Sequence, residues 1–197
     1  MIIEKLQSAQ DALEGYQRRW KIKINPAKTQ AIFFSRRRCQ RFLPQSHVTA
    51  MNHTVPWSEH VEYLGLTFDR KLKFDQHIAN SLNKCGKLTK MLYPLVCRQS
   101  RLCEANKILL YKLIFRPSLT YGFPAWHRCA RTRRKTLQIR QNKLLKMMLN
   151  LPFNFPSAEL RDVTNVEALD TWITRLLSKF WTRCSMSENI LISNMVP

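Results

Sequence analysis

Apolar residues near the N-terminus recur at alternating spacings of four and three. The stripe consists of Ile2, Leu6, Ala9, Leu13, Tyr16 and Trp20. Polar and charged residues occupy most of the positions between them, and this period places the apolar side chains on one face of a helix. The pattern predicts an amphipathic helix over residues 2–20, followed by the turn signal Asn25-Pro26.

The pattern then changes to short apolar runs separated by turn residues, which favours strands. We expect one strand over residues 29–35, where aromatic and β-branched side chains gather, and a short strand around residues 47–51. Residues 61–68 (VEYLGLTF) predict a third strand with Gly65 at its centre. Glycine inside a strand costs stability and often marks the close approach of another backbone, so we expect a contact at Gly65.

After residue 73, four apolar stripes follow the period of a helix. They are Phe74, Ile78, Leu82, Cys85, Leu88, Leu92 and Leu95; Leu102, Ala105, Leu109 and Leu113; Leu137, Leu144, Met148 and Leu151; and Val166, Leu169, Ile173, Leu176 and Phe180. We expect the second helix to end before Pro117 and the third before Pro152. Thr164, followed three residues later by Glu167, predicts the N-cap of the fourth helix. Residues 116–127, with two prolines and a glycine, predict a structured turn.

These elements predict a mostly α-helical α+β protein, in which a small antiparallel β element precedes a helical bundle. We expect three parts: residues 1–70 with the strands, residues 71–151 as a basic helical domain, and residues 152–197 as a C-terminal helical extension. The 197 residues are 45% hydrophobic, which is enough to form a core.

The distribution of charge indicates the class of partner. The chain carries a formal net charge of +20, far more than solubility requires. Residues 76–158 contain sixteen lysines and arginines but one acidic residue, Glu104, so ion pairs within helices cannot neutralise them. This excess indicates a nucleic acid as the partner. A solvated basic surface on an ordinary soluble protein is the alternative.

The sequence contains no assembled catalytic motif. It lacks GxSxG, GxxxxGK[ST], HExxH and GxGxxG. Two-metal phosphoryl transfer needs converging carboxylates, but the five aspartates are scattered. The nearest pair, Asp69 and Asp75, is expected at a strand end and a helix start. We therefore expect a binding surface without catalytic residues, metal ligands or a cofactor of its own.

Cysteines and apolar runs limit the expected compartment. The six cysteines include no CxxC pair, which predicts reduced thiols in an intracellular protein and no structural zinc. No apolar run reaches the length of a membrane span, and the N-terminus lacks the layout of a signal peptide. We expect a nuclear or cytoplasmic protein without a membrane partner.

Aromatic residues lie among the basic ones. They are Tyr93, Tyr111, Phe115, Tyr121, Phe123 and Trp126. Rings beside lysine and arginine stack on the bases of single strands or hybrid duplexes. Packing in the core is the alternative for most of them, and we favour it for Tyr111 and Phe115 because they lie in or beside a helical stripe.

Three segments together resemble a known family. They are RRWKIKINPAKTQAIFFSRR at 18–37, HVEYLGLTFDRKLKFDQHI at 60–78 and LYKLIFRPSLTYGFPAW at 110–126. In this order they resemble the late part of the reverse transcriptase of non-LTR retrotransposons. The resemblance is strongest to the jockey group of these elements. The resemblance implies that the catalytic aspartates lie upstream, in the palm, and that this chain holds the end of the palm and the thumb. Mg²⁺ is then expected only in the full-length polymerase.

The resemblance also assigns roles to individual residues. It implies that Lys28 lies close to the phosphates of the incoming nucleotide, with a surface lysine at a turn as the alternative. It implies that Tyr63, Leu64 and Gly65 form the hairpin that holds the primer terminus, with a glycine needed for sheet curvature as the alternative. The residues implied to contact the nucleic-acid backbone are Lys84, Lys87, Lys90, Arg131, Arg133, Arg134 and Lys135.

We therefore expect the C-terminal part of an RNA-directed DNA polymerase, which binds an RNA template and a DNA primer but does not polymerise alone. Its other expected partners are the missing palm and fingers segments. A stand-alone basic nucleic-acid-binding protein, such as a domesticated element fragment, is the main alternative. A basic subunit of a larger ribonucleoprotein is a third possibility.

Overall fold

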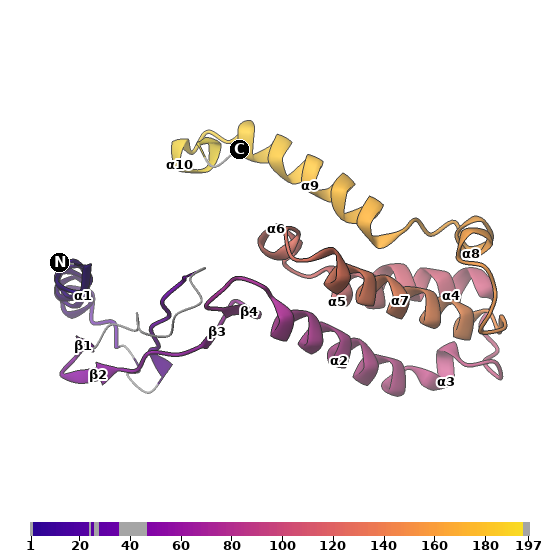
Figure 1. Cartoon of the computed structure of the whole chain (residues 1–197), viewed down its shortest axis with the longest axis horizontal. Coiled ribbons are helices and arrows are strands. Elements are labelled where there is room, and N and C mark those ends of the chain that lie inside the picture. The colour runs from indigo at the N-terminus through magenta and orange to yellow at the C-terminus, as the bar shows by residue number, and fades with distance from the viewer. Residues whose placement is uncertain (1, 24, 26–27, 36–46, 195–197) are drawn as a thin grey trace. The chain divides into compact units, whose positions relative to one another are not determined.

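The computed structural model describes residues 2–23, 25, 28–35 and 47–194. The chain folds as two compact units, Met1–Leu72 and Lys73–Pro197 (Figure 1). Helices dominate, and the described strands form two antiparallel sheets of two strands each. This confirms the predicted α+β class with mostly α structure.

The first unit begins with the predicted helix, α1 (Ile2–Arg19). Polar side chains attach α1 to strand β1 (Val48–Ala50). The side-chain amide of Gln7 donates to the carbonyl of Thr49 at 3.1 Å and accepts from its N–H at 2.8 Å. Glu14 accepts from the N–H of Met51 at 2.6 Å. The apolar stripe is not buried by these contacts, since Leu6, Leu13, Tyr16 and Trp20 are exposed.

The short strand expected near residue 48 is confirmed as β1, which pairs with β2 (His53–Val55). The strand expected over residues 29–35 is wrong for most of its length. Only Ala31 forms a bridge there, a parallel one with Trp57. Its N–H donates to the carbonyl of Pro56 at 3.0 Å. Proline has no N–H with which to continue the ladder toward residue 29.

Residues 61–68 form a hairpin and not the single strand that we predicted. Strand β3 (His60–Tyr63) pairs with β4 (Leu66–Asp69). Leu64 and Gly65, with φ of 49° and 74°, form the two-residue turn. Positive φ at both central residues is the geometry of a type I′ turn, which explains the glycine. The turn therefore accounts for the glycine by itself, and the contact expected at Gly65 remains a prediction.

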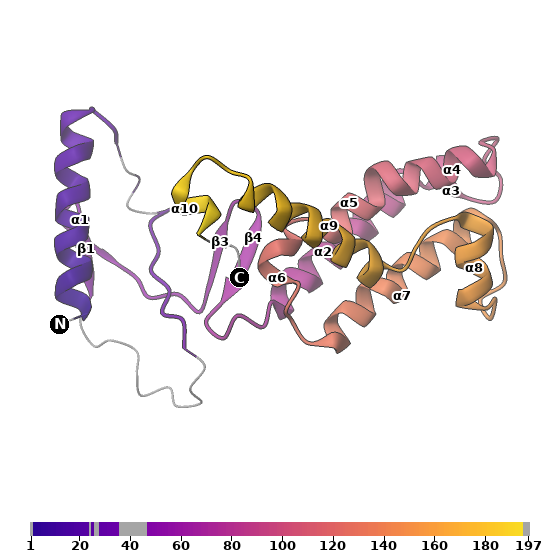
Figure 2. The same cartoon turned by 90° about the horizontal axis from the view of Figure 1, so that it is seen from above.

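The second unit is helical (Figures 1 and 2). Its elements are α2 (Asp75–Met91), α3 (Tyr93–Val96), α4 (Glu104–Leu110), the π-helical turn η3 (Tyr111–Phe115), α5 (Arg116–Thr120), α6 (Phe123–Trp126), α7 (Arg131–Met148), α8 (Ser157–Thr164), α9 (Leu169–Ser185) and α10 (Ile190–Ser193). Within the described part of the chain, no helix combines the length and the apolar composition that a bilayer crossing requires.

The core of this unit lies where α2, η3, α5 and α7 meet, and α9 packs on α7. The buried members of the predicted stripes include Phe74, Ile78, Cys85, Leu137, Leu144, Met148, Val166, Leu169 and Ile173. Their burial confirms the facing of the first, third and fourth stripes. Helices α8 and α9 both contact α7. The predicted boundary at residue 152, which makes residues 152–197 a separate extension, remains a prediction.

The second predicted stripe is not the buried face of its helix. Leu109 and Leu113 are exposed, whereas Tyr111, Phe115 and Leu119 are fully buried. The buried residues are spaced by four, a spacing that the π-helical turn at residues 111–115 accommodates. The helix was therefore predicted correctly, but its buried face was not.

Pro117 does not end the helical segment, contrary to our prediction. Helical conformation continues from Glu104 to Thr120. In η3 the N–H of Arg116 donates to the carbonyl of Tyr111, five residues back. Pro117 then occupies the first turn of α5, where its missing N–H costs little.

Two further boundaries differ from the sequence prediction. Residues 116–127 contain α5 and α6, joined by a turn at Gly122, and are not an irregular turn throughout. Thr164 ends α8 and is not the N-cap of the next helix, since its hydroxyl donates to the carbonyl of Leu160 at 2.6 Å. The last long helix, α9, starts at Leu169.

Candidate nucleic-acid interface

The tip of the β3–β4 hairpin displays the three residues that resemble a primer-holding element. Tyr63, Leu64 and Gly65 are all exposed. Leu64 has a left-handed backbone (φ 49°), which is uncommon for a residue with a side chain. Such strain persists where the surrounding structure requires it and is found frequently at functional sites.

Lys28 is exposed beside the Asn25 turn. Its N–H donates to the carbonyl of Asn25 at 3.0 Å, and the hydroxyl of Thr29 donates to the same carbonyl at 3.1 Å. The residues between Asn25 and Lys28 lie outside the described part of the chain. The structure therefore presents the Lys28 ammonium to solvent, and its proposed role at a phosphate remains a prediction.

Helix α2 presents a polar, basic face opposite to its core face. Lys84, Lys87 and Lys90 are exposed at successive intervals of three. Residues three apart lie close together on a helix surface, so the three ammonium groups form one row. Asn80 and Asn83 extend this exposed face toward the start of the helix. A row of cations with neighbouring amides is suited to contacting successive phosphates.

The start of α7 holds four cations, and two of them are paired with carboxylates. Arg133 donates from two nitrogens to Asp75, the first residue of α2. Arg134 pairs with Asp170 at the start of α9, with 3.7 Å between the charged atoms. The first turn of α7 therefore ties the starts of two other helices to itself.

The ion pair of Arg133 also changes the acidity of its partner. The hydrogen bond from Arg133 lowers the pKa of Asp75 below its ordinary value, against a smaller effect of burial. Asp75 therefore remains ionised and balances the charge of Arg133. Arg131 and Lys135 are exposed. These two are the best placed of the four for external phosphates.

The aromatic residues that were candidates for base stacking differ in their exposure to solvent. Tyr111, Phe115 and Trp126 are fully buried, which confirms the core interpretation of the first two. The indole N–H of Trp126 donates to the carbonyl of Tyr121 at 2.8 Å. The side chains of Tyr93 and Tyr121 are exposed. Only exposed rings of this kind are available for stacking on a base.

Two features of the surface were missed by the sequence analysis. The turn between α7 and α8 exposes Phe153, a residue outside every periodic stripe. On α9, the Trp172 ring lies beside two guanidinium groups: that of Arg116, 3.6 Å from the ring centroid, and that of Arg175, at 4.7 Å. Arg175 also pairs with Glu167. For the exposed Phe153, the sequence offered one signal: a proline on each side of residues 153–155, which indicates a turn.

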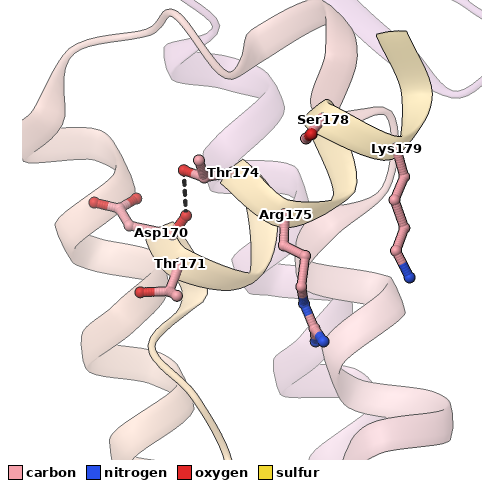
Figure 3. Close-up of a pocket in the computed structure, with 6 residues that line it drawn as sticks. All are labelled: Asp170, Thr171, Thr174, Arg175, Ser178 and Lys179. Carbon is pink, nitrogen blue, oxygen red and sulfur yellow. Dashed lines mark hydrogen bonds between the residues drawn. The ribbon is translucent and has the colours of Figure 1, made fainter. Parts of the chain in front are cut away.

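A shallow, open pocket follows one side of α9 (Figure 3). Its lining consists of Asp170, Thr171, Thr174, Arg175, Ser178 and Lys179. The hydroxyl of Thr174 is bound to the carbonyl of Asp170 at 2.9 Å. Because all the lining residues come from one helix, the pocket is a groove along that helix and not a cleft between elements.

The described residues contain no group of three or more histidine, cysteine, aspartate or glutamate side chains that could hold a metal ion. Asp75 is bound to Arg133. The side chain of Asp69 accepts from the N–H of Lys71 at 3.0 Å. Both carboxylates of the nearest sequence pair thus have structural partners.

Comparisons with known proteins add the family context. No family model and no solved structure matches the chain. The probable RNA-directed DNA polymerase from transposon BS of Drosophila melanogaster is 23% identical over 98% of this chain. The corresponding enzyme from transposon X-element is 27% identical over 93%. The RNA-directed DNA polymerase from mobile element jockey of Drosophila funebris is 26% identical over 96%.

The chain spans about one fifth (21%) of the length of each of these three relatives. The similarity confirms the resemblance carried by the three sequence motifs. Along nearly its whole length, this chain is similar to a segment of the RNA-directed DNA polymerases of jockey-like mobile elements.

Proposed function

We propose that this chain is the template–primer-binding, C-terminal part of an RNA-directed DNA polymerase from a jockey-like mobile element. The observation that carries the proposal is its similarity, over 93–98% of its length, to such polymerases. The exposed basic face of α2 supports it. The catalytic aspartates lie in the part of the polymerase that this chain does not include, so the chain alone binds nucleic acid without polymerising.

The hairpin tip holds the primer terminus in this proposal. Gly65 has no side chain, and Tyr63 is exposed beside it. A sugar–phosphate backbone can therefore approach the turn closely. Lys28 lies near the phosphates of the incoming nucleotide.

The helical unit binds the paired template and primer through their backbones. Lys84, Lys87 and Lys90 contact successive phosphates, and Arg131 and Lys135 extend the contacts. Arg133 and Arg134 contribute less, because Asp75 and Asp170 already balance their charges. Contacts of this kind depend on charge and helix shape and not on sequence. Affinity for an RNA–DNA hybrid should therefore fall steeply with salt.

Photo-crosslinking tests the placement of the primer. An RNA–DNA hybrid with a recessed primer carries a photoreactive group at the primer 3′ end, and mass spectrometry identifies the labelled peptide. We expect labelling at residues 63–65. A control hybrid with the group at the primer 5′ end should not label these residues. Labelling that is equal from both ends, or confined to other segments, would contradict the proposal.

Primer extension tests the expected inactivity. The purified chain should bind the hybrid without extending the primer in the presence of Mg²⁺ and nucleotides. Robust Mg²⁺-dependent synthesis by these residues would show that the catalytic groups lie within this chain.

A further inference from the structure

The turn between α7 and α8 presents a single aromatic ring to solvent. Phe153 is 80% exposed, although burying a phenylalanine side chain stabilises a folded protein. The N–H of Phe155 donates to the carbonyl of Pro152 at 3.0 Å, which closes a turn with Phe153 near its tip. Pro156 follows at the start of α8. The backbone therefore holds the ring outward.

Two lysines from the last turns of α7 lie beside this ring. The ammonium of Lys146 donates to the carbonyl of Phe153 at 2.7 Å and lies 5.8 Å from the ring centroid. The ammonium of Lys143 lies 5.9 Å from the centroid. At this distance the two cations lie over the ring without covering it, because Phe153 remains largely exposed.

The local charge is complementary to phosphate. The sequence contains no acidic residue between Glu104 and Glu159. Lys143 and Lys146 are therefore not opposed by a carboxylate from their own helix or from the turn. An exposed ring with cations nearby is the arrangement that binds a nucleotide of a single strand, since the ring stacks on the base and the cations bind the phosphate.

We propose that Phe153, Lys143 and Lys146 form a binding site for an unpaired nucleotide of a single-stranded nucleic acid. The inference rests on the proposed function and extends it, because the bases of an RNA–DNA hybrid are stacked inside the duplex and cannot reach the ring. Figures 1 and 2 place the turn between α7 and α8 at the end of the helical unit away from α6. The site serves an unpaired part of the template strand, next to the paired region bound by α2.

Two strands of equal length and charge separate stacking from phosphate binding. One is a twelve-nucleotide oligothymidylate, and the other is an abasic strand with the same backbone. Phe153→Ala should weaken binding of the oligothymidylate by roughly 5- to 150-fold, the range that base stacking supplies. It should leave binding of the abasic strand and of an RNA–DNA hybrid unchanged. Lys146→Gln should weaken binding of both single strands.

Further variants distinguish the ring from apolar bulk and from a folding defect. Phe153→Trp should retain the affinity for oligothymidylate, and Phe153→Leu should lose it. Leu113→Ala removes a side chain that is 65% exposed on η3. It should change neither affinity. Circular dichroism should show that each variant keeps the helical content of the parent chain.

The outcomes separate the two proposals. If the parent chain binds oligothymidylate no better than the abasic strand, or if Phe153→Ala binds both as the parent does, the stacking site is wrong while the proposed function stands. Retention of affinity by Phe153→Leu would also overturn stacking. If the parent chain binds neither single strand nor the hybrid, the proposed function fails together with the site.

Discussion

The guanidinium of Arg140 lies against the backbone of α2 at Gly86. A Cβ atom built on Gly86 would come within 2.9 Å of the Nη2 atom of Arg140. The same nitrogen donates to the carbonyl of Leu82 at 3.4 Å, a long hydrogen bond. The Arg140 side chain, from α7, thus crosses α2 at Gly86, where α2 has no side chain of its own.

Gly86→Ala should raise the free energy of unfolding by about 0.5 kcal/mol, because glycine inside a helix is less stable than alanine by roughly 0.5–1 kcal/mol. The gain is reduced by displacing Arg140, which is the end of a long side chain. In an Arg140→Ala background, Gly86→Ala should raise the free energy of unfolding by nearer 1 kcal/mol. Urea unfolding measures both. A loss above about 1 kcal/mol would mean that Arg140 cannot move aside.

Tyr111→Phe should destabilise the helical unit. The buried Tyr111 hydroxyl donates to Oε1 of Gln141 at 2.5 Å, and Nε2 of Gln141 donates to the carbonyl of Glu167 at 3.0 Å. Burial raises the pKa of Tyr111 above its ordinary value, so the phenol remains protonated and keeps donating. Its loss leaves a buried acceptor unpaired, at a cost of about 1–3 kcal/mol.

Tyr93→Phe is the matched control for this variant, since the Tyr93 side chain is exposed. It should change the unfolding free energy by less than about 0.5 kcal/mol. Equal effects of the two substitutions in urea unfolding would show that the hydrogen bond between α7 and η3 does not stabilise the fold.

The stability of the chain should fall as the pH decreases through about 6.5, in part because of His77. Burial lowers the pKa of His77 below its ordinary value of 6.5, and a hydrogen bond with the Tyr121 backbone offsets this in part. The folded state therefore binds its proton at lower pH than the unfolded state does. Since the unfolded state takes up the proton first, acidification favours unfolding.

His77→Gln should remove this part of the pH dependence. We expect the unfolding free energy of the parent chain to decrease more than that of the variant between about pH 7.5 and about pH 5.5, in urea titrations at fixed salt. Above about pH 7.5 the difference between the two chains should be constant. Parallel curves over the whole range would contradict the assignment.

Asp75→Asn should increase the affinity for an RNA–DNA hybrid. The substitution removes the carboxylate that balances Arg133, so one more cation is available to phosphate. The slope of log affinity against log salt should steepen by about 0.9, the value for one additional phosphate contact on duplex DNA. Fluorescence anisotropy at several salt concentrations measures it. An unchanged or shallower slope would show that Arg133 does not face the nucleic acid.

Periodicity predicted the helices but not the hairpin. Residues 61–68 are mostly apolar, as in a buried strand, and Leu64 is not a typical residue for a turn that requires positive φ. The identity of residue 64 therefore concealed the turn, although the resemblance to a primer-holding hairpin indicated it. The N-terminal helix was predicted, but the exposure of Tyr16 and Trp20 was not, because amphipathicity alone implies a partner surface.

The second helix shows why a buried face can be missed. Lys107 is one of the sixteen cations of residues 76–158, but it is buried and donates to the carbonyl of Cys97 at 3.0 Å. The π-helical turn that follows brings Tyr111 and Phe115 onto the same side. Sequence patterns with a period of 3.6 cannot register this change. Phe153 was missed because a turn has no period at all.

The central claim is that the α2 face binds the nucleic-acid backbone, and a salt titration tests it most directly. The variant Lys84→Gln/Lys87→Gln/Lys90→Gln is compared with a control of equal charge loss, Arg161→Gln/Lys179→Gln/Arg183→Gln, whose three residues are exposed on α8 and α9. The measured quantity is the slope of log affinity for an RNA–DNA hybrid against log salt. We predict that the α2 variant loses roughly 2–3 from this slope and that the control loses less than about 1. Equal losses from the two variants would contradict the claim, since binding would then depend on total charge and not on this face.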